Sequence, residues 1–545
     1  MKFRKNFKRL VLCAFIALAW GTFLNEKAHA ERSSAPMASP AMTQLDTASQ
    51  SFVTRPTTTA AVIADTRLPE PSHGGRSSVS EPTYATTSTS SAELVKLQAD
   101  VQKLMDQQAK DKEKAEKKAA EDKEKKFTSP DTKLQVRVFY DGTVGSDGGV
   151  LDNAMGSGTG ARQLRLTWKG SMYDMIEYSF SVDFGGSGSY NFKDCFGGFY
   201  NLPWGIGVRA GHFKEPWSME ELSSTADTVM MEKSCLNNFK NIAGGRNNGL
   251  MIHNWHEADR FSWAVGVFAA SMREGLDSNG TALTCFSNGL QKDNYAFTSR
   301  LTFLPYYQQW CDGRETFWHI GAAYTYRKFD TSTGRPGARG TSVSTRPDNA
   351  LQGNLLNSGT MTGLDSLNGF QFDTAFVYGS LALEFEQAFY WLDDSNCKAA
   401  GTDSPMISAG YVQVSYCLTG EGRNYKKGGG FLGGITPNCP YYNICKDGMH
   451  MFSGPGAWEI AYRCSWADLD DLAGTSTDGG ITWVGGYGNN VGHTFTHTIG
   501  LNWYLNKNTR LMFDYSYGNA DYVGGINDGK SGWASIFGTR FQLIF

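Results

Sequence analysis

From residue 127 to residue 545, short stretches of the chain alternate apolar and polar residues. In residues 318–327, WHIGAAYTYR, the larger apolar side chains occupy every second position, and residues 176–184 and the closing FGTRFQLIF repeat the pattern. Successive side chains of a strand point to opposite faces, so this period predicts β-strands with one apolar and one polar face. Turns rich in Gly, Asn, Asp and Ser separate the stretches.

A soluble β-sandwich has the same period, so alternation alone does not separate it from a membrane barrel. The apolar faces are unusually aromatic and the opposite faces are charged, as in barrel strands that cross a bilayer. No clear helical pattern interrupts residues 127–545, and the last alternating stretch runs to Phe545. At about 26 residues per strand and connection, the region predicts an all-β, antiparallel transmembrane β-barrel of about 16 strands.

Three other segments precede the predicted barrel. Residues 1–30 have a basic start, an apolar run and Ala-His-Ala at the end, which predicts a cleaved export signal. Residues 31–92 are rich in Ser, Thr, Ala and Pro and predict a disordered linker, with a glycosylated stalk or a segment threading the cell wall as alternatives. Residues 93–126 lack Gly and Pro and carry two apolar heptads, which predicts a helix, either a short coiled coil or a lone solvated helix.

Charge and cysteine usage exclude several classes of function. Without residues 1–30 the chain carries about eight more acidic than basic residues, which does not suggest a nucleic-acid partner. The nine remaining cysteines cannot all pair within one chain, and none has zinc-site spacing. Since no nucleophile arrangement has local support either, we expect no enzyme activity, no cofactor and no metal.

Six stretches carry a resemblance to a known family. They are, in order, ARQLRLTWKG, AGHFKEPWSMEELSSTADTVMMEKS, GYVQVSYCLTGEGRNY, GAWEIAYR, THTIGLNWYLNKNTRLMFDY and FGTRFQLIF. With them, residues 133–545 resemble the phosphate-selective porins O and P. The resemblance implies a 16-stranded barrel in the outer membrane, usually a homotrimer, that passes small solutes or inorganic anions such as phosphate by diffusion. The terminal Phe545 resembles the tag that the barrel-assembly machinery reads in outer-membrane proteins.

A pore works through charges in its lumen that replace part of an ion's hydration. Arg is suited to phosphate, because its planar fork can bind two oxygens. The alternation predicts nine inward-facing basic residues as anion-guiding candidates: Arg137, Arg165, Lys169, Arg209, Arg300, Arg327, Arg463, Arg510 and Arg540. An open alternative is that any polar residue is tolerated in a wet lumen, since acids share those faces, among them Glu177, Asp183, Glu384, Glu386, Glu459 and Asp514.

The resemblance also implies that the loop after GHFKEPW folds into the barrel as its constriction. The candidates in that loop are Lys214, Glu220, Glu221, Asp227 and Lys233. Acids outnumber bases both in this loop and in residues 127–545 as a whole. We therefore expect a general or weakly selective channel rather than a strict phosphate filter.

Two other functions remain open from the residues alone. The barrel could serve as the anchor of a tether between the outer membrane and the cell wall, with residues 31–126 binding the wall. A sugar-specific pore would need a row of aromatic residues in the lumen, and Phe139 is the clear inward-facing one.

The glycine-rich GGGFLGG at residues 428–434 has no βα context for a nucleotide and predicts an extracellular loop.

Overall fold

The computed structural model describes residues 130–545 with gaps, together with single helical positions between Gln102 and Lys114. The gaps are residues 152–153, 187–190, 257, 270–294, 330–341, 360, 362–363, 395–403, 445–449, 453, 474–489 and 524–526. The predicted export signal and linker, and most of the predicted helix at 93–126, lie outside the described residues. Among those described, no helix has the length and apolar character that crossing a membrane requires.

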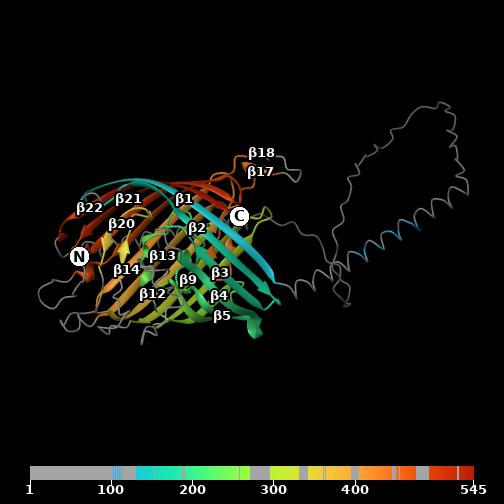
Figure 1. Cartoon of the computed structure of the whole chain (residues 1–545), viewed down its shortest axis with the longest axis horizontal. Helices are drawn as coiled ribbons and strands as arrows, with labels where there is room; N and C mark the ends of the chain where they lie inside the picture. Colours follow the sequence, from blue (N-terminus) through green and yellow to red (C-terminus); the bar gives the residue numbers. More distant parts are fainter. Residues whose placement is uncertain are drawn as a thin grey trace, which may run out of the picture. The chain divides into compact units, whose positions relative to one another are not determined.

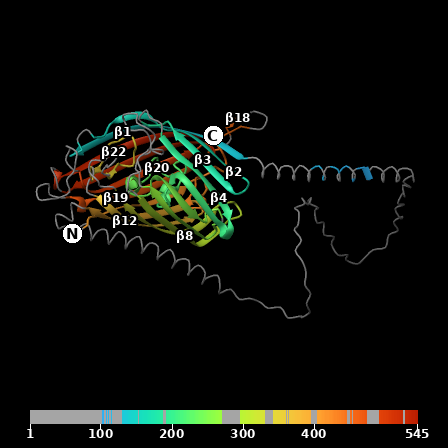
Figure 2. The same ribbon diagram turned by 60° about the horizontal axis from the view of Figure 1, so that its bottom comes forward.

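Sixteen antiparallel strands close into one barrel, in which each strand pairs with its neighbours in chain order (Figures 1 and 2). This confirms the predicted fold class and strand number of the barrel. The strands are β1 (Asp131–Gly149), β2 (Ser157–Met172), β3 (Ile176–Asp183), β4 (Asn191–Leu202), β5 (Ile206–Lys214), β6 (Arg246–His253), β7 (Phe261–Ala269), β8 (Tyr295–Gln309), β9 (Glu315–Lys328), β12 (Leu364–Tyr378), β13 (Leu381–Asp394), β14 (Met406–Cys417), β19 (Ala457–Asp468), β20 (Gly492–Tyr504), β21 (Thr509–Tyr522) and β22 (Ser531–Ile544).

The final alternating stretch forms the closing strand of the barrel. β22 pairs with β1 over its length, and Arg137 lies opposite Ile544. The last residue continues the pairing, because the Val136 amide donates to the Phe545 carbonyl (2.7 Å) and the Phe545 amide donates to the Val136 carbonyl (3.0 Å). Closure leaves no open sheet edge, which is the condition for a sheet to lie in lipid.

The alternation along each strand separates an outer apolar face from an inner polar face. On β9, Thr325 and Arg327 are fully buried inside the barrel, whereas the ring of Tyr324 is 39% exposed on the outside. Phe139 faces inward as expected, but other aromatic residues face inward as well. Other aromatic side chains are also buried inside the barrel, namely Phe317, Tyr390 and Tyr411.

Because neighbouring strands are antiparallel, the connections alternate between two ends of the barrel. One end has mostly tight turns, such as residues 379–380 between β12 and β13, and we call it the short-turn end. The opposite end has the longer connections at 215–245 and 329–363. The connection at 418–456, between β14 and β19, is an exception, because it is long and belongs to the short-turn end.

The 418–456 connection contains four short strands: β15 (Tyr425–Lys426), β16 (Phe431–Leu432), β17 (Tyr442–Ile444) and β18 (His450–Phe452). In both views β18 lies at the end of the barrel where the C-terminus is marked (Figures 1 and 2). GGGFLGG includes β16. The sequence predicts an extracellular loop for this stretch, and the strand order puts it at the short-turn end, opposite the connections at 215–245 and 329–363.

Residues 215–245, here called the inner loop, fold into the barrel. They contribute many of the side chains of the main apolar core. The loop contains the helical turns α3 (Met219–Leu222) and η2 (Cys235–Asn241), which the sequence pattern did not predict. Its Trp217 and Phe239 pack against Tyr390 on the wall. This core also includes residues of the 329–363 connection, which contributes β10 (Ser344–Thr345) and β11 (Leu356–Asn357).

Candidate functional site

A cavity of about 890 Å³ lies inside the barrel. The inner face of β1–β5 forms one side, and the inner loop from Glu221 to Lys240 forms the other. The lining residues extend from Lys133, near the short-turn end, to Gly185 and Asn191, where β3 ends and β4 begins at the opposite end of those strands. Arg346 of the 329–363 connection also lines the cavity, which therefore runs lengthwise along this wall beside the inserted segments.

The lining of the cavity is rich in positive charge. It contains thirteen Lys or Arg side chains against seven Asp or Glu, although acids outnumber bases in the barrel region as a whole. Five of the nine basic residues expected to face the pore line it: Arg137, Arg165, Lys169, Arg209 and Arg540. The fold thus places basic side chains along the cavity and places most of the acidic side chains of the barrel region elsewhere.

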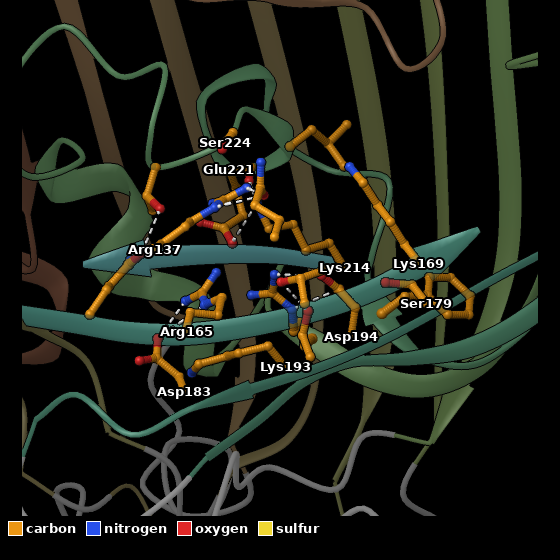
Figure 3. Close-up of a pocket in the computed structure, with 18 of the residues that line it drawn as sticks. Arg137, Arg165, Lys169, Ser179, Asp183, Lys193, Asp194, Lys214, Glu221 and Ser224 are labelled. Atoms are coloured by element: carbon orange, nitrogen blue, oxygen red, sulfur yellow. Dashed lines mark hydrogen bonds and ion pairs between the residues drawn. The ribbon is translucent and has the colours of Figure 1, made fainter. Parts of the chain in front are cut away.

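Strands β1 and β2 present like charges in register. Arg137 lies directly opposite Arg165, and Lys133 lies directly opposite Lys169. Arg165 is paired with Asp183 (2.7 Å), whereas Arg137 donates to the neutral Gln135 side chain (3.0 and 3.1 Å). Figure 3 shows the Arg137, Arg165 and Lys169 side chains among the lining residues. Like charges directly opposite destabilise a sheet, so this wall holds its cations at a cost in folding free energy.

The other four expected pore residues are buried and do not line the cavity. Each holds a partner on the inner loop, on the 329–363 connection or on another strand. The contacts are Arg300 with Asp373 (2.6 Å), Arg327 with Glu215 (2.6 Å), Arg463 with Asp348 (2.9 Å) and Glu220 (3.2 Å), and Arg510 with the backbone oxygens of Thr228 and Val229 (2.7 and 2.9 Å). These arginines face inward, but they hold inserted segments against the wall.

The start of α3 is fixed by an acid on β13. The Glu386 carboxylate accepts from the Ser218 hydroxyl (2.7 Å) and from the backbone amides of Met219 (3.1 Å) and Glu220 (2.6 Å). The Ser218 hydroxyl in turn caps the Glu221 amide (3.0 Å). An acid is favourable at the first turn of a helix, where amides lack partners within the helix. This contact positions the inner loop across the barrel.

Acids of the inner loop are engaged in similar anchors rather than free in the pore. Glu232 pairs with Arg162 (2.7 Å) and Arg540 (2.6 Å). Burial alone would raise the pKa of Glu232, but these two guanidinium groups outweigh it and hold that pKa well below its usual range. Burial raises the pKa of Glu220, although Arg463 counteracts the shift. Glu232 thus offsets two basic residues that line the cavity, and Glu220 offsets the buried Arg463.

Three of the remaining constriction candidates, Lys214, Glu221 and Lys233, lie together at the edge of the cavity. Lys233 pairs with Glu221 (2.7 Å), and Lys214 donates to the Ser223 carbonyl (3.1 Å) and lies 3.8 Å from the same carboxylate. Burial opposes ionisation of Glu221, but the two lysines prevail and lower its pKa to about 2. Asp227 does not line the cavity, and its backbone oxygen accepts from Arg423 (2.7 Å).

Comparison with known proteins decides the family. Residues 132–545 match the sequence profile described as phosphate-selective porin O and P. The chain belongs to this family. Together with the closed barrel, membership makes the protein a porin, a channel of the outer membrane.

The similar proteins include Porin O of Pseudomonas aeruginosa, which is 24% identical over 62% of this chain and 70% of its own length. An uncharacterized protein of Caulobacter vibrioides is 23% identical over 77% of this chain and 75% of its own. Among solved structures, an anion-selective porin from Comamonas acidovorans is 11% identical with a TM-score of 0.42, and covers 76% of this chain and 100% of its own. OprB of Pseudomonas putida is 10% identical with a TM-score of 0.43, and covers 76% and 94%.

Some residues that line the pore were missed because β-bulges break the alternation. Between β1 and β2 the register shifts, so that Phe139 pairs with Gln163 and Tyr140 with Ala161, which leaves Arg162 as the extra residue. A second shift between β3 and β4 leaves Lys193 and Asp194 outside the regular register. A bulge turns a side chain that strict parity would send outward. A Gly within a strand is a sequence signal for a β-bulge. Neither of these two bulges contains a Gly, so the sequence did not reveal them.

Proposed function

We propose that this porin is a passive diffusion channel that prefers small anions, inorganic phosphate among them, over cations. The excess of Lys and Arg along the cavity carries the proposal. It revises the expectation of weak selectivity, which was based on charge summed over the whole barrel. An ion in the pore feels the nearby groups that face it far more strongly than screened charges on distant loops.

The wall of β1 and β2 is proposed as the main guide for anions. Among the described residues, Arg137 and Lys169 form no ion pair with a carboxylate, and both line the cavity. Arg165 and Arg209 contribute less net charge, because Asp183 and Glu177 accept their hydrogen bonds. Cations spaced along one wall attract an oxyanion without enclosing it, which suits passage rather than tight binding.

The test is competition between anions in single channels of the full-length porin. Adding inorganic phosphate to a chloride solution should lower the chloride current in a saturable way, because phosphate occupies the same guanidinium and ammonium groups more strongly. Replacement of phosphate by an equal concentration of a neutral sugar should leave the current unchanged after correction for viscosity. A chloride current that does not respond to phosphate would contradict a phosphate preference.

Two further proposals concern the assembly of this porin. Family membership supports a homotrimer, which native mass measurement of the detergent-extracted porin would test. Phe545 is proposed as an assembly signal, since this residue is 64% exposed and is held in the sheet by backbone hydrogen bonds to Val136. Deletion of Phe545 should lower the amount of folded barrel in the membrane, whereas Phe545→Tyr should not.

A further inference from the structure

The part of the cavity nearer the short-turn end has an aromatic wall that the proposed function does not require. Four half-buried aromatic side chains line it: Phe196, Tyr200, Trp255 and Phe431. Beneath them, Phe213 and Phe268 are almost fully buried and form an ordinary core with Phe196 and Trp255 at its edge. A channel for inorganic ions gains nothing from apolar rings exposed to pore water.

Glycines bring two distant segments of the chain together at this wall. A Cβ atom at Gly428 would lie 2.5 Å from the Trp255 carbonyl oxygen, so only glycine allows this approach. A Cβ atom at Gly429 would lie 3.1 Å from the Phe431 ring and 3.7 Å from the Trp255 ring, and the φ of Gly429 is +93°. The glycine-rich stretch in the 418–456 connection thus places Phe431 beside Trp255.

A cation lies within the aromatic wall. The Arg209 guanidinium carbon is 4.2 Å from the centre of the Phe196 ring and 5.5 Å from that of Trp255. Its charge is shared with Glu177 (2.8 Å), which also accepts from His256 (3.2 Å). A guanidinium plane held against rings provides a flat surface on which another flat group can stack.

The guiding cations lie in register with the aromatic wall. Across the strands β1 to β4, Lys133 pairs with Lys169, Lys169 with Ser179, and Ser179 with Phe196. Phe196 is therefore two strand spacings, about 10 Å, from Lys169. A molecule whose ring lies at the aromatic wall would have its anionic group within reach of Lys169 and the Ser179 hydroxyl.

We propose that this part of the cavity is a subsite for organic anions that carry a flat ring, such as aromatic carboxylates and aromatic phosphate monoesters. The proposal rests on the anion pore proposed above and names a solute class for it. Rings alone would suit a neutral sugar, and cations alone would suit inorganic phosphate. Their juxtaposition suits a solute that has both a ring and a negative charge.

Matched pairs of anions test the subsite in single channels of the full-length porin. Benzoate is compared with acetate, and phenyl phosphate with inorganic phosphate, each added to the same chloride solution. We expect the ring-bearing member of each pair to lower the chloride current at a concentration about three- to tenfold below that of its partner, because aromatic stacking adds to the shared charge. Equal potency within both pairs would overturn the subsite.

Variants locate the effect. Trp255→Leu, and independently Phe431→Leu, should remove most of the difference within each pair and leave acetate and inorganic phosphate unchanged. Lys169→Gln should weaken all four anions alike. If the Leu variants conduct chloride normally and keep the full difference, the aromatic wall is not the subsite. Loss of anion preference in chloride itself would instead contradict the proposed function, so the two failures are distinguishable.

Discussion

Two walls of this barrel have the same pattern of inward-facing basic residues and use them in different ways. On β1 and β2, Arg137 and Lys169 face the cavity. On β19 and β21, Arg463 and Arg510 are fully buried, because the inner loop packs over them. The difference teaches that the charge of a pore is decided by which wall the inserted loop covers, and not by how many arginines face inward.

The largest expected effect comes from the wall of β19 and β21, which the inner loop covers. Arg463→Met would leave Asp348 and Glu220 buried without their partner, and loss of one member of a buried ion pair costs about 3–5 kcal/mol. We expect a lower denaturation midpoint and noisy, larger single-channel currents as the inner loop loses its anchor. The solvent-exposed turn residue Lys507 provides a control, since Lys507→Met should alter neither measurement.

On the wall of β1 and β2, which the inner loop leaves open to the cavity, substitutions should change ion selectivity without lowering stability. Arg137→Gln combined with Lys169→Gln should lower the chloride-to-potassium permeability ratio by about two- to fivefold at low salt, because each charge acts at short range in water. Stability should hold or rise, since two opposed like-charge pairs are relieved. The effect should shrink in 1 M salt. Arg137→Lys with Lys169→Arg keeps both charges and should keep the ratio.

A smaller, pH-dependent effect should arise at Glu221, on the inner loop at the edge of the cavity. Its pKa is lowered from 4.5 to about 2, so its contribution to folding is complete above about pH 4.5 and is lost as the pH falls toward 2. Glu221→Gln should therefore flatten the loss of stability over that range. Near neutral pH the same variant should raise anion preference, because Lys214 and Lys233 lose their counter-charge. An unchanged acid profile would show that this carboxylate is not held as described.

Much of the barrel was predictable from local pattern, and much of the pore was not. Alternation predicts the strands and the inward side of Arg327 or Arg540, because side-chain direction along a strand depends on position alone. It fails at Arg162, where a bulge adds one residue to β2. It also cannot distinguish Arg137 from Arg463, because burial of the latter depends on Asp348, more than one hundred residues away in the chain. The aromatic wall was missed for the same reason, since Trp255 and Phe431 meet through the fold.

The central claim is that groups facing the cavity, not the acidic barrel as a whole, set the selectivity of this porin. The zero-current potential of the full-length protein in a gradient of potassium chloride tests it most directly. The account predicts a potential with the sign of chloride preference, larger at low salt than at high salt. A potential of the opposite sign, as the excess of acids in the barrel would produce, would contradict it.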